Sequence, residues 1–402
     1  MRVTLINQYY PPDASATAEL ASEVAQALAD RGHVVTVVAG RPSYDPLTRR
    51  RWRLIAREQD GRVMVKRVGS AAFDRRHMRG RIANYVSYLA MAGWPALFAR
   101  TDLVLVMTDP PAASVVAALV AKLRGLPLVV NVRDLHPDMA ITVGLLRPGP
   151  VSRLWDALQT WALRRAARVI VLGADMRRRV LDKGVEPERV VIVRDGAPLP
   201  ATLPPRNHPV SQQVRNGFEF VVLHAGNVGF SCAWEALLGA ARLMESERVG
   251  FVFVGDGAAM PAVRAEARQL RNVRLEPFRP VAEVPHVLQA GDVHVVSVRE
   301  NVEGLVVPSK LYPVLAAGRP PLVVAAAGSD AAQLVAGSGC GWVADPSDPG
   351  AIATAIRDAM DDPGELRKRG ERARALASRF QRPRLLAEVA GVVEREVENA
   401  NV

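Results

Sequence analysis

The sequence predicts an α/β protein made of two consecutive doubly wound domains, and three observations lead to this prediction. The chain has 402 residues, more than one hydrophobic core usually supports. Apolar strand-like runs alternate with helical patterns in both halves, as in parallel sheets that helices cover on two faces. A proline-rich stretch without periodicity, residues 198–217, separates the two series and is the expected linker.

The first half opens with a strand-helix-strand unit. A strand is expected in RVTLINQYY, a helix from Thr17 to Arg31, and a second strand in GHVVTVVAG. The same order returns in DLVLVMTDP, PAASVVAALVAKLRG and LPLVVNVRD. These strand runs are almost continuously apolar, which is typical of parallel strands buried on both faces. We therefore expect an N-terminal domain of residues 1–197.

The second half repeats the alternation. A helix is expected around Leu311 to Ala317, and one or two arginine-rich helices from Glu365 to Glu398. The second domain should cover residues 218–378, and a C-terminal helix, 379–402, should pack back on the first domain. Open parallel sheets bind ligands at the carboxyl ends of their strands, so we expect both sheets to face a common cleft. The other expected elements are FEFVVLHAGNVG, CAWEALLGAARLM, VGFVFVGDG, NVRLEPF, GDVHVVSV and PPLVVAAA.

The composition limits the classes of function. The formal net charge is +11, which favours an acidic partner: nucleic acid, anionic lipid or a phosphorylated substrate. The sequence has no helix-turn-helix, zinc-knuckle or aromatic RNA-binding signature, and its basic residues are dispersed, so nucleic acid is not the expected partner. The longest apolar stretch, Tyr85 to Ala99, is too short to span a bilayer, and the first residues lack a secretory signal. We expect a cytoplasmic protein.

Cysteine and histidine usage gives no sign of a metal site. Cys232 and Cys340 lie far apart in the sequence, as expected of free thiols in a reducing compartment. The seven histidines are scattered without metal-ligand spacing. We expect neither a metal nor another cofactor.

Two glycine-containing turns follow strands in the second half. His224 ends one strand, and Gly226 and Gly229 bracket the turn after it, with a helix expected from near Ser231. Such a turn either binds an anion through backbone amides and the helix N-terminus or is a plain tight turn. Gly255-Asp256-Gly257 allows the same two interpretations, with Asp256 as a helix cap in the second.

A series of motifs along nearly the whole chain resembles glycosyltransferase family 4. In order they are YYPPDASATAELASEVAQALADRGHVVTVV, HAGNVG with WEALLGAA, FVFVGDG, NVRLEPF, VPSKLYPVLAAGRP and GCGWVADPSDP. Within that family they look most like the branch that builds bacterial O-antigen and capsular polysaccharides. The resemblance implies a GT-B fold of two Rossmann-like domains, with the nucleotide-sugar donor on the C-terminal domain and the acceptor on the N-terminal one. It also implies retention of anomeric configuration without a metal ion.

The sequence departs from the family pattern at the donor site. Depending on the register, the two glutamates of the family fall on Leu305 and Pro313, or on Glu303 and Leu311. The second carboxylate, which resembling enzymes use on the nucleotide ribose, is missing in either register. The family's two basic residues after the first C-terminal strand correspond to Asn227 and to Cys232 or Ala233, so two phosphate-neutralising charges are also missing.

A reduced set of groups is left to bind the donor. Backbone amides of the glycine turn and of a helix starting at Ser309 are expected to contact phosphate, with Lys310 and Arg299 as cations. Phe278 and Arg279 occupy the place of the family's base-recognition loop. The full set is His224, Gly226, Asn227, Gly229, Phe278, Arg279, Arg299, Glu303, Ser309 and Lys310.

On the acceptor side, VVNVRDLHPDMA places polar residues after a buried strand. Asp134 either deprotonates or orients the acceptor hydroxyl, or caps a helix or pairs with Arg133. His136 either shares the catalytic role or is structural. Residues 75–98 combine cationic residues with apolar and aromatic ones, which suits either contact with an anionic membrane or an ordinary core helix.

The sequence thus predicts a retaining glycosyltransferase of surface-polysaccharide synthesis, with UDP-sugar as the expected donor and a polyprenyl-linked or other glycan as the acceptor. Two alternatives stay open. One is a transferase acting on a soluble small molecule. The other is a partner subunit that has lost donor binding. This alternative is suggested by Asn227, Leu305 and Pro313, which stand where the family has charged residues.

Overall fold

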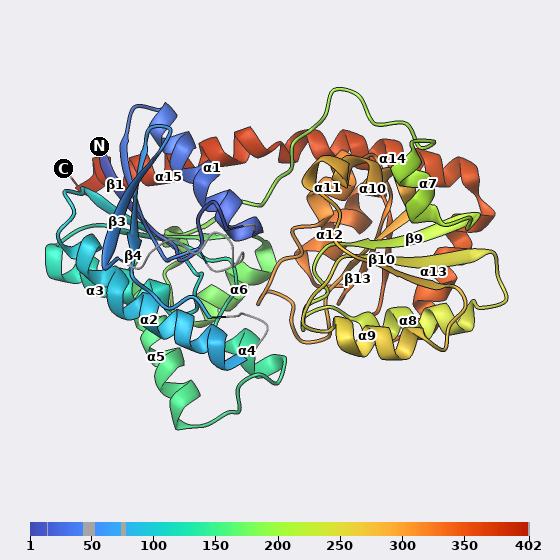
Figure 1. Ribbon diagram of the computed structural model, residues 1–402, viewed down its shortest axis with the longest axis horizontal. Coiled ribbons are helices and arrows are strands. Elements are labelled where there is room, and N and C mark those ends of the chain that lie inside the picture. Colours follow the sequence, from blue (N-terminus) through green and yellow to red (C-terminus); the bar gives the residue numbers. More distant parts are fainter. Residues whose placement is uncertain (14, 43–52, 74–77, 401–402) are drawn as a thin grey trace. The chain divides into compact units, whose positions relative to one another are not determined.

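The computed structural model describes residues 1–402 except 14, 43–52, 74–77 and 401–402 (Figure 1). It divides into two compact units, each with its own parallel sheet. Unit 1 comprises Met1–Val193 with Arg384–Val402, and unit 2 comprises Arg194–Pro383. The predicted α/β class with two doubly wound sheets is confirmed.

Unit 1 holds an eight-stranded sheet in the order β3-β4-β2-β1-β5-β6-β7-β8. All neighbours are parallel except β3 and β4, which form an antiparallel pair at the edge. The strands are β1 (Arg2–Ile6), β2 (Val34–Ala39), β3 (Ile55–Asp60), β4 (Val63–Val68), β5 (Leu103–Met107), β6 (Leu128–Asn131), β7 (Arg168–Val171) and β8 (Val190–Ile192). The predicted helix from Thr17 to Arg31 is confirmed as α1 (Ala16–Asp30), which Ser15 caps by accepting from the Ala18 amide.

The other helices of unit 1 are α2 (Met78–Leu97), α3 (Ala113–Arg124), α4 (Asp138–Thr142), α5 (Pro150–Arg165) and α6 (Ala174–Asp182). Helix α15 (Arg382–Ala400) belongs to this unit for most of its length. Its Glu394 bonds Arg31 and His33, which follow α1, and Glu396 bonds Arg168 at the start of β7. These ion pairs hold the C-terminal helix on the first sheet's unit.

Unit 2 holds a six-stranded, all-parallel sheet in the order β11-β10-β9-β12-β13-β14. Its strands are β9 (Phe220–Ala225), β10 (Val249–Val254), β11 (Val273–Glu276), β12 (Val293–Ser297), β13 (Pro321–Val324) and β14 (Trp342–Ala344). Its helices are α7 (Pro209–Arg215), α8 (Trp234–Leu243), α9 (Met260–Ala267), α10 (Val284–Ala290), α11 (Leu311–Ala316), α12 (Asp330–Ser338), α13 (Pro349–Asp361) and α14 (Pro363–Ala377).

Apolar clusters on both faces of this sheet form the core of unit 2. One face packs against α8, α9 and α13, and the other against α7 and α10. Successive residues of one strand lie on opposite faces, as Val221 and Val222 of β9 do. Helix α7 lies inside the expected linker. Pro209 occupies its first turn, and the side chain of Val214 on this helix is fully buried, so packing stabilises the helix. The linker without structure is therefore shorter than predicted.

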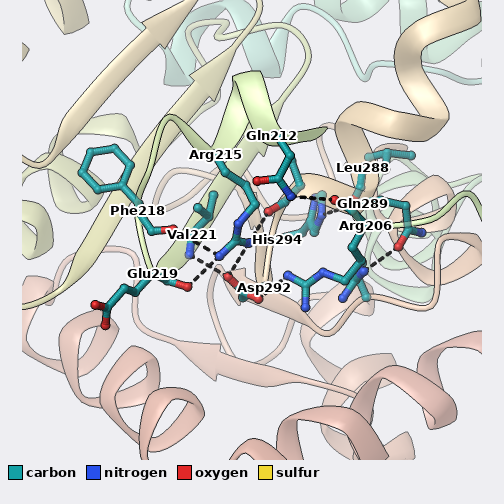
Figure 2. Close-up of polar contacts among 12 residues, drawn as sticks. Arg206, Gln212, Arg215, Phe218, Glu219, Val221, Leu288, Gln289, Asp292 and His294 are labelled. Carbon is teal, nitrogen blue, oxygen red and sulfur yellow. Dashed lines mark hydrogen bonds and ion pairs between the residues drawn. The ribbon is translucent and has the colours of Figure 1, made fainter. Parts of the chain in front are cut away.

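A polar network closes the amino edge of this sheet around Asp292, which precedes β12 (Figure 2). One carboxylate oxygen accepts from Arg206, and the other accepts from Arg215 and from the Val221 amide, both at 2.8 Å. Arg215 also donates to the carbonyls of Ala290, Phe218 and Glu219. Asp292 is thus saturated, and its arginine partners hold its pKa below the usual range although burial opposes this.

Candidate functional site

Four side chains from separate segments meet at the carboxyl edge of the six-stranded sheet. Lys310, just before α11, donates from Nζ to His224 Nε2 at 2.9 Å and to the Asn227 carbonyl at 3.1 Å. His224 lies near the end of β9. Cys232 Sγ lies 3.7 Å from His224 Nε2 and 3.1 Å from the hydroxyl oxygen of Ser297, the last residue of β12. The topology of parallel strands brings these residues together, since strand ends meet at one edge.

Lys310 is a partly buried cation whose partners are all neutral. Among the described residues, no carboxylate lies within ion-pair distance of it. Burial lowers the pKa of Lys310. Burial, and then the nearby Lys310 charge, lower the pKa of His224 well below its usual value, so this imidazole is neutral and its Nε2 accepts. Burial raises the pKa of Cys232, which is therefore a thiol. An uncompensated ammonium in such surroundings favours binding of an anion.

The glycine turn lies beside this ammonium. Gly226 has φ +120, and the position that its Cβ would take is 3.8 Å from Lys310 Nζ. A Cβ on Gly255 would lie 2.0 Å from the Gly226 carbonyl oxygen, so the two glycine turns pack directly on each other.

The backbone bonds of the turn revise one expectation about its amides. Gly226 N donates to Val254 O, and Val228 N to Asp256 O. These two amides are used within the fold. Of the turn's amides in the described structure, those of Asn227 and Gly229 have no protein acceptor and could face a ligand.

Helix α8 begins at Trp234 and not near Ser231. The predicted helix around Leu311 to Ala317 is confirmed as α11 (Leu311–Ala316), which therefore does not start at Ser309, the residue whose amide was expected to contact phosphate. Ser309 is exposed ahead of α11, and Lys310 takes the cap position. With six residues, α11 is too short to supply a helix N-terminus as an anion site by itself.

The remaining predicted donor residues have other partners or lie at the surface. Arg299, the second expected cation, forms a partly exposed ion pair with Glu235. Arg279 pairs with Glu276 at 3.4 Å and Glu283 at 3.8 Å, and Phe278 is exposed. Glu303 is half-buried and forms a backbone bridge to Val306.

Three of the four positions where the family pattern would place carboxylates, all except Glu303, are apolar and at least half-buried. Leu305 and Leu311 are each 2% exposed, and Pro313 is half-buried within α11. No carboxylate could occupy the two leucine positions without desolvation.

In unit 1, Asp134 and His136 follow β6 as predicted. The Thr108 hydroxyl accepts from the amides of Arg133 and Asp134, at 2.8 Å and 3.3 Å, and so fixes the start of the loop. The His136 ring stacks on Trp155 at a centroid distance of 5.8 Å. Burial lowers the pKa of His136, although Asp134 and Asp138 oppose this, so the ring is a base or acceptor at neutral pH.

Two further groups near this loop were missed by the sequence analysis. Lys183 bonds both Asp138, at 2.8 Å, and Asp156, at 2.6 Å, which ties α4 to α5. Arg81 of α2 lies close enough to lower the pKa of His136. Both groups are distant from the loop in the sequence, which leaves no local signal that could have found them.

Helix α2 contains most of the predicted membrane-contact segment, whose residues 75–77 lie outside the described part of the chain. Its exposed apolar side chains include Ile82, Val86 and Trp94, and Phe98 follows it. Within the described residues, no helix combines the length and apolarity needed to cross a bilayer. Nor does any group of three His, Cys, Asp or Glu side chains among them form a potential metal site.

Two protein-family models match the chain. The model described as "Glycosyl transferase 4-like domain" matches residues 16–196, and the one described as "Glycosyl transferases group 1" matches residues 219–362. The chain belongs to the glycosyltransferase 4-like family. This glycosyltransferase is 31% identical to the probable glycosyltransferase WbjE of Pseudomonas aeruginosa over 266 residues, 64% of the chain and 66% of WbjE. It is 24% identical to the putative colanic acid biosynthesis glycosyl transferase WcaI of Escherichia coli, over 90% of the chain and 92% of WcaI.

Solved structures support the fold of this glycosyltransferase. Sucrose-phosphate synthase of Thermosynechococcus elongatus matches with a TM-score of 0.73 at 16% identity, over 100% of both chains. HepE of Anabaena, in a complex with UDP-glucose, matches with a TM-score of 0.68 at 17% identity, over 98% of this chain and 100% of HepE. WaaG, a glycosyltransferase of lipopolysaccharide biosynthesis, matches with a TM-score of 0.66 at 18% identity, over 98% and 99%. The predicted GT-B class is thereby confirmed, and at these identities the likeness concerns the fold alone.

Proposed function

We propose that this glycosyltransferase moves a sugar, with retention, from a UDP-sugar to a lipid-linked or other glycan acceptor in bacterial surface-polysaccharide synthesis. The observation that carries the proposal is the Lys310 ammonium, which lies at the Gly226 turn with only neutral protein partners. The name of WbjE supports the reaction class, that of WcaI, a colanic acid biosynthesis glycosyl transferase, supports the pathway, and the UDP-glucose complex of HepE supports the donor class.

In this proposal Lys310 binds the diphosphate of the donor. The bond from the anomeric carbon to the diphosphate oxygen breaks, and the leaving group gains negative charge. A fixed ammonium and backbone amides stabilise that charge, and losing one such group typically slows the reaction about 100-fold. The amides of Asn227 and Gly229 are the available donors in the turn. Because Lys310 supplies the positive charge, the proposed step needs no metal ion.

On unit 1, Asp134 is proposed to orient or deprotonate the acceptor hydroxyl, whose oxygen forms the new bond to the anomeric carbon. His136, a neutral ring held against Trp155, is proposed to hydrogen-bond the same acceptor. For Asp134→Asn we expect lost turnover with unchanged nucleotide affinity. Undiminished turnover would remove Asp134 from the mechanism.

A peripheral position on the cytoplasmic face of the membrane is part of the proposal. Arg79 and Arg81 accompany the exposed apolar residues of α2, a combination that suits an anionic interface. Sedimentation with anionic vesicles tests this, using Trp94→Ser and, as a matched control in unit 2, Leu243→Ser, which changes an exposed leucine of α8. Equal sedimentation of both variants and the parent protein would argue for a soluble acceptor.

The test of the donor site is a thermal-shift titration with UDP, GDP, dTDP and the matching nucleosides, with and without EDTA. A ligand at 100 times its Kd should stabilise the protein by about 2.7 kcal/mol. Lys310→Met should weaken diphosphate binding more than nucleoside binding, whereas Lys368→Met, at an exposed position of α14, should change neither. If no diphosphate shifts the transition, the alternative of a partner subunit without donor binding becomes the better explanation.

A further inference from the structure

A second partly buried cation with a neutral partner lies at the opposite edge of the six-stranded sheet. Arg319 follows α11, and its side chain donates to the amide oxygen of Gln289. Its Nε is buried and has no hydrogen-bond partner among the described residues. Burial, and then the Arg206 charge, lower the pKa of Arg319 to about 10, so the group is still charged at neutral pH but poorly stabilised.

The charges around Arg319 do not balance. Arg206, Arg215 and Arg319 bring three positive charges, and Asp292 brings one negative charge, which leaves two in excess. The two oxygens of Asp292 are already occupied by Arg206, Arg215 and the Val221 amide (Figure 2). His294, the other titratable group here, is neutral, because burial lowers its pKa to about 4 and its Nε2 donates to the Leu288 carbonyl.

Other arginines of unit 2 show what a purely structural role looks like. Arg215 donates to three backbone carbonyls as well as to Asp292, and Arg374 donates to the carbonyls of Ala316 and Pro200. Both therefore satisfy acceptors that the fold would otherwise leave unpaired. Arg319 satisfies one side-chain amide and keeps an N–H group unused.

We propose that Arg319 and Arg206 bind a phosphate-class anion at the amino edge of the six-stranded sheet. Arg206 is about half exposed, its side chain being 44% accessible, so the anion can enter from solvent. A guanidinium binds phosphate oxygens in pairs, and Arg206 uses only part of its five donors on Asp292. The side chain of Arg319 is less exposed to solvent than that of Arg206, so only a small anion such as free phosphate can contact both. This site is separate from Lys310 and does not depend on the proposed transferase function.

Calorimetric titration with inorganic phosphate, in a buffer without other multivalent anions, tests the site. The proteins are the parent, Lys310→Met, Arg319→Gln and the double variant. We expect Lys310→Met to retain one phosphate site, and the double variant to bind at that site at least tenfold more weakly. Arg248→Gln, at an exposed position paired with Glu219, is the matched control and should bind as the parent does.

A stability measurement separates this role from a structural one. The substitution Arg319→Gln removes a buried charge, so without phosphate the variant should unfold at a temperature no lower than the parent. Added phosphate should then stabilise only proteins that keep Arg319. The proposal is overturned if Lys310→Met and the double variant bind phosphate equally, or if Arg319→Gln loses stability without losing phosphate. Binding to phosphatidate vesicles that depends on Arg319 would overturn the assignment to a free anion.

Discussion

The two edges of the six-stranded sheet handle buried charge in different ways. At the amino edge, Asp292 has both oxygens bonded by arginines and an amide, so its negative charge is compensated within the protein. At the carboxyl edge, Lys310 has only an imidazole and a carbonyl as partners. A charge that the fold itself neutralises serves stability, whereas one left with neutral partners is available to a ligand. Arg319 lies at the amino edge, but like Lys310 at the carboxyl edge it has a neutral hydrogen-bond partner, the side chain of Gln289.

The largest expected effect comes from breaking the compensated network. In Asp292→Asn the side chain keeps its shape, but Arg206 and Arg215 lose their counter-charge. We expect the free energy of unfolding to fall by about 3 kcal/mol, since removing one partner of a buried pair leaves a desolvated charge. Urea denaturation measures this. Glu219→Gln, which breaks an exposed pair with Arg248, should cost less than about 1 kcal/mol; a similar loss in both variants would contradict a special role for Asp292.

The next largest effect is expected at the carboxyl edge, where a substitution should weaken ligand binding without lowering stability. Lys310→Met should leave the stability of the ligand-free protein equal or higher, because a partly buried charge without a counter-charge is removed. Affinity for the nucleoside diphosphate should fall roughly tenfold to a hundredfold, the range for one charged hydrogen bond. Urea denaturation of the parent and the variant measures the change in stability, and nucleotide titration of both measures the change in affinity. A less stable variant with normal affinity would make Lys310 a structural residue.

The buried His294 predicts a pH dependence that belongs to the amino edge. Its pKa is about 4 in the folded protein and about 6.5 when unfolded, so below pH 6.5 the unfolded chain takes up the proton first. Stability is therefore lost as the pH falls from 6.5 towards 4, by about 2 kcal/mol between pH 7 and pH 5 from this residue.

His294→Gln isolates this contribution, because His136 and His224, whose pKa values are also lowered, are present in both proteins. The difference in stability between parent and variant should shrink as the pH is lowered. Parallel curves from pH 7 to pH 5 would show that His294 does not titrate differently in the two states.

The smallest loss of stability and of nucleotide affinity is expected for substitution of Arg299. This residue is a cation with a carboxylate partner, and it lies at the same edge as Lys310, which has none. Its ion pair with Glu235 is partly exposed, so Arg299→Gln should change stability by less than about 1 kcal/mol. Nucleotide affinity should change less than threefold. A loss as large as that of Lys310→Met would show that Glu235 releases Arg299 to the ligand, and the contrast between paired and unpaired cations would fail.

Sequence periodicity was sufficient for most of the fold. Strands such as β5, β10 and β12 are apolar throughout because both of their faces are buried, and this pattern is readable without knowing their neighbours. The hairpin of β3 and β4 was missed, since β3 reads IAREQD, has one exposed face and depends on pairing with β4. Helix α7 was missed because its short apolar signal, Val210 and Val214, is surrounded by prolines and polar residues.

The site was less predictable than the fold, because its partners are distant in the sequence. Lys310 and His224 were each candidates, but their hydrogen bond joins residues 86 apart. Arg299 looked like a free cation because Glu235, its partner, is 64 residues away on α8. Sequence motifs identify which residues lie at a strand end, whereas the pairing among them is decided by packing.

The shortness of α11 has a consequence for how this segment can change. Lys310 precedes the helix and Arg319 follows it, so six helical residues, about 9 Å of rise, set the phase between the two cations. Inserting or deleting one residue would turn everything beyond it by about 100°, and one of the two side chains would leave its place. We therefore expect insertions and deletions to be tolerated in the loops on either side of the segment from 310 to 319 and not within it, so that the two cations keep a fixed spacing.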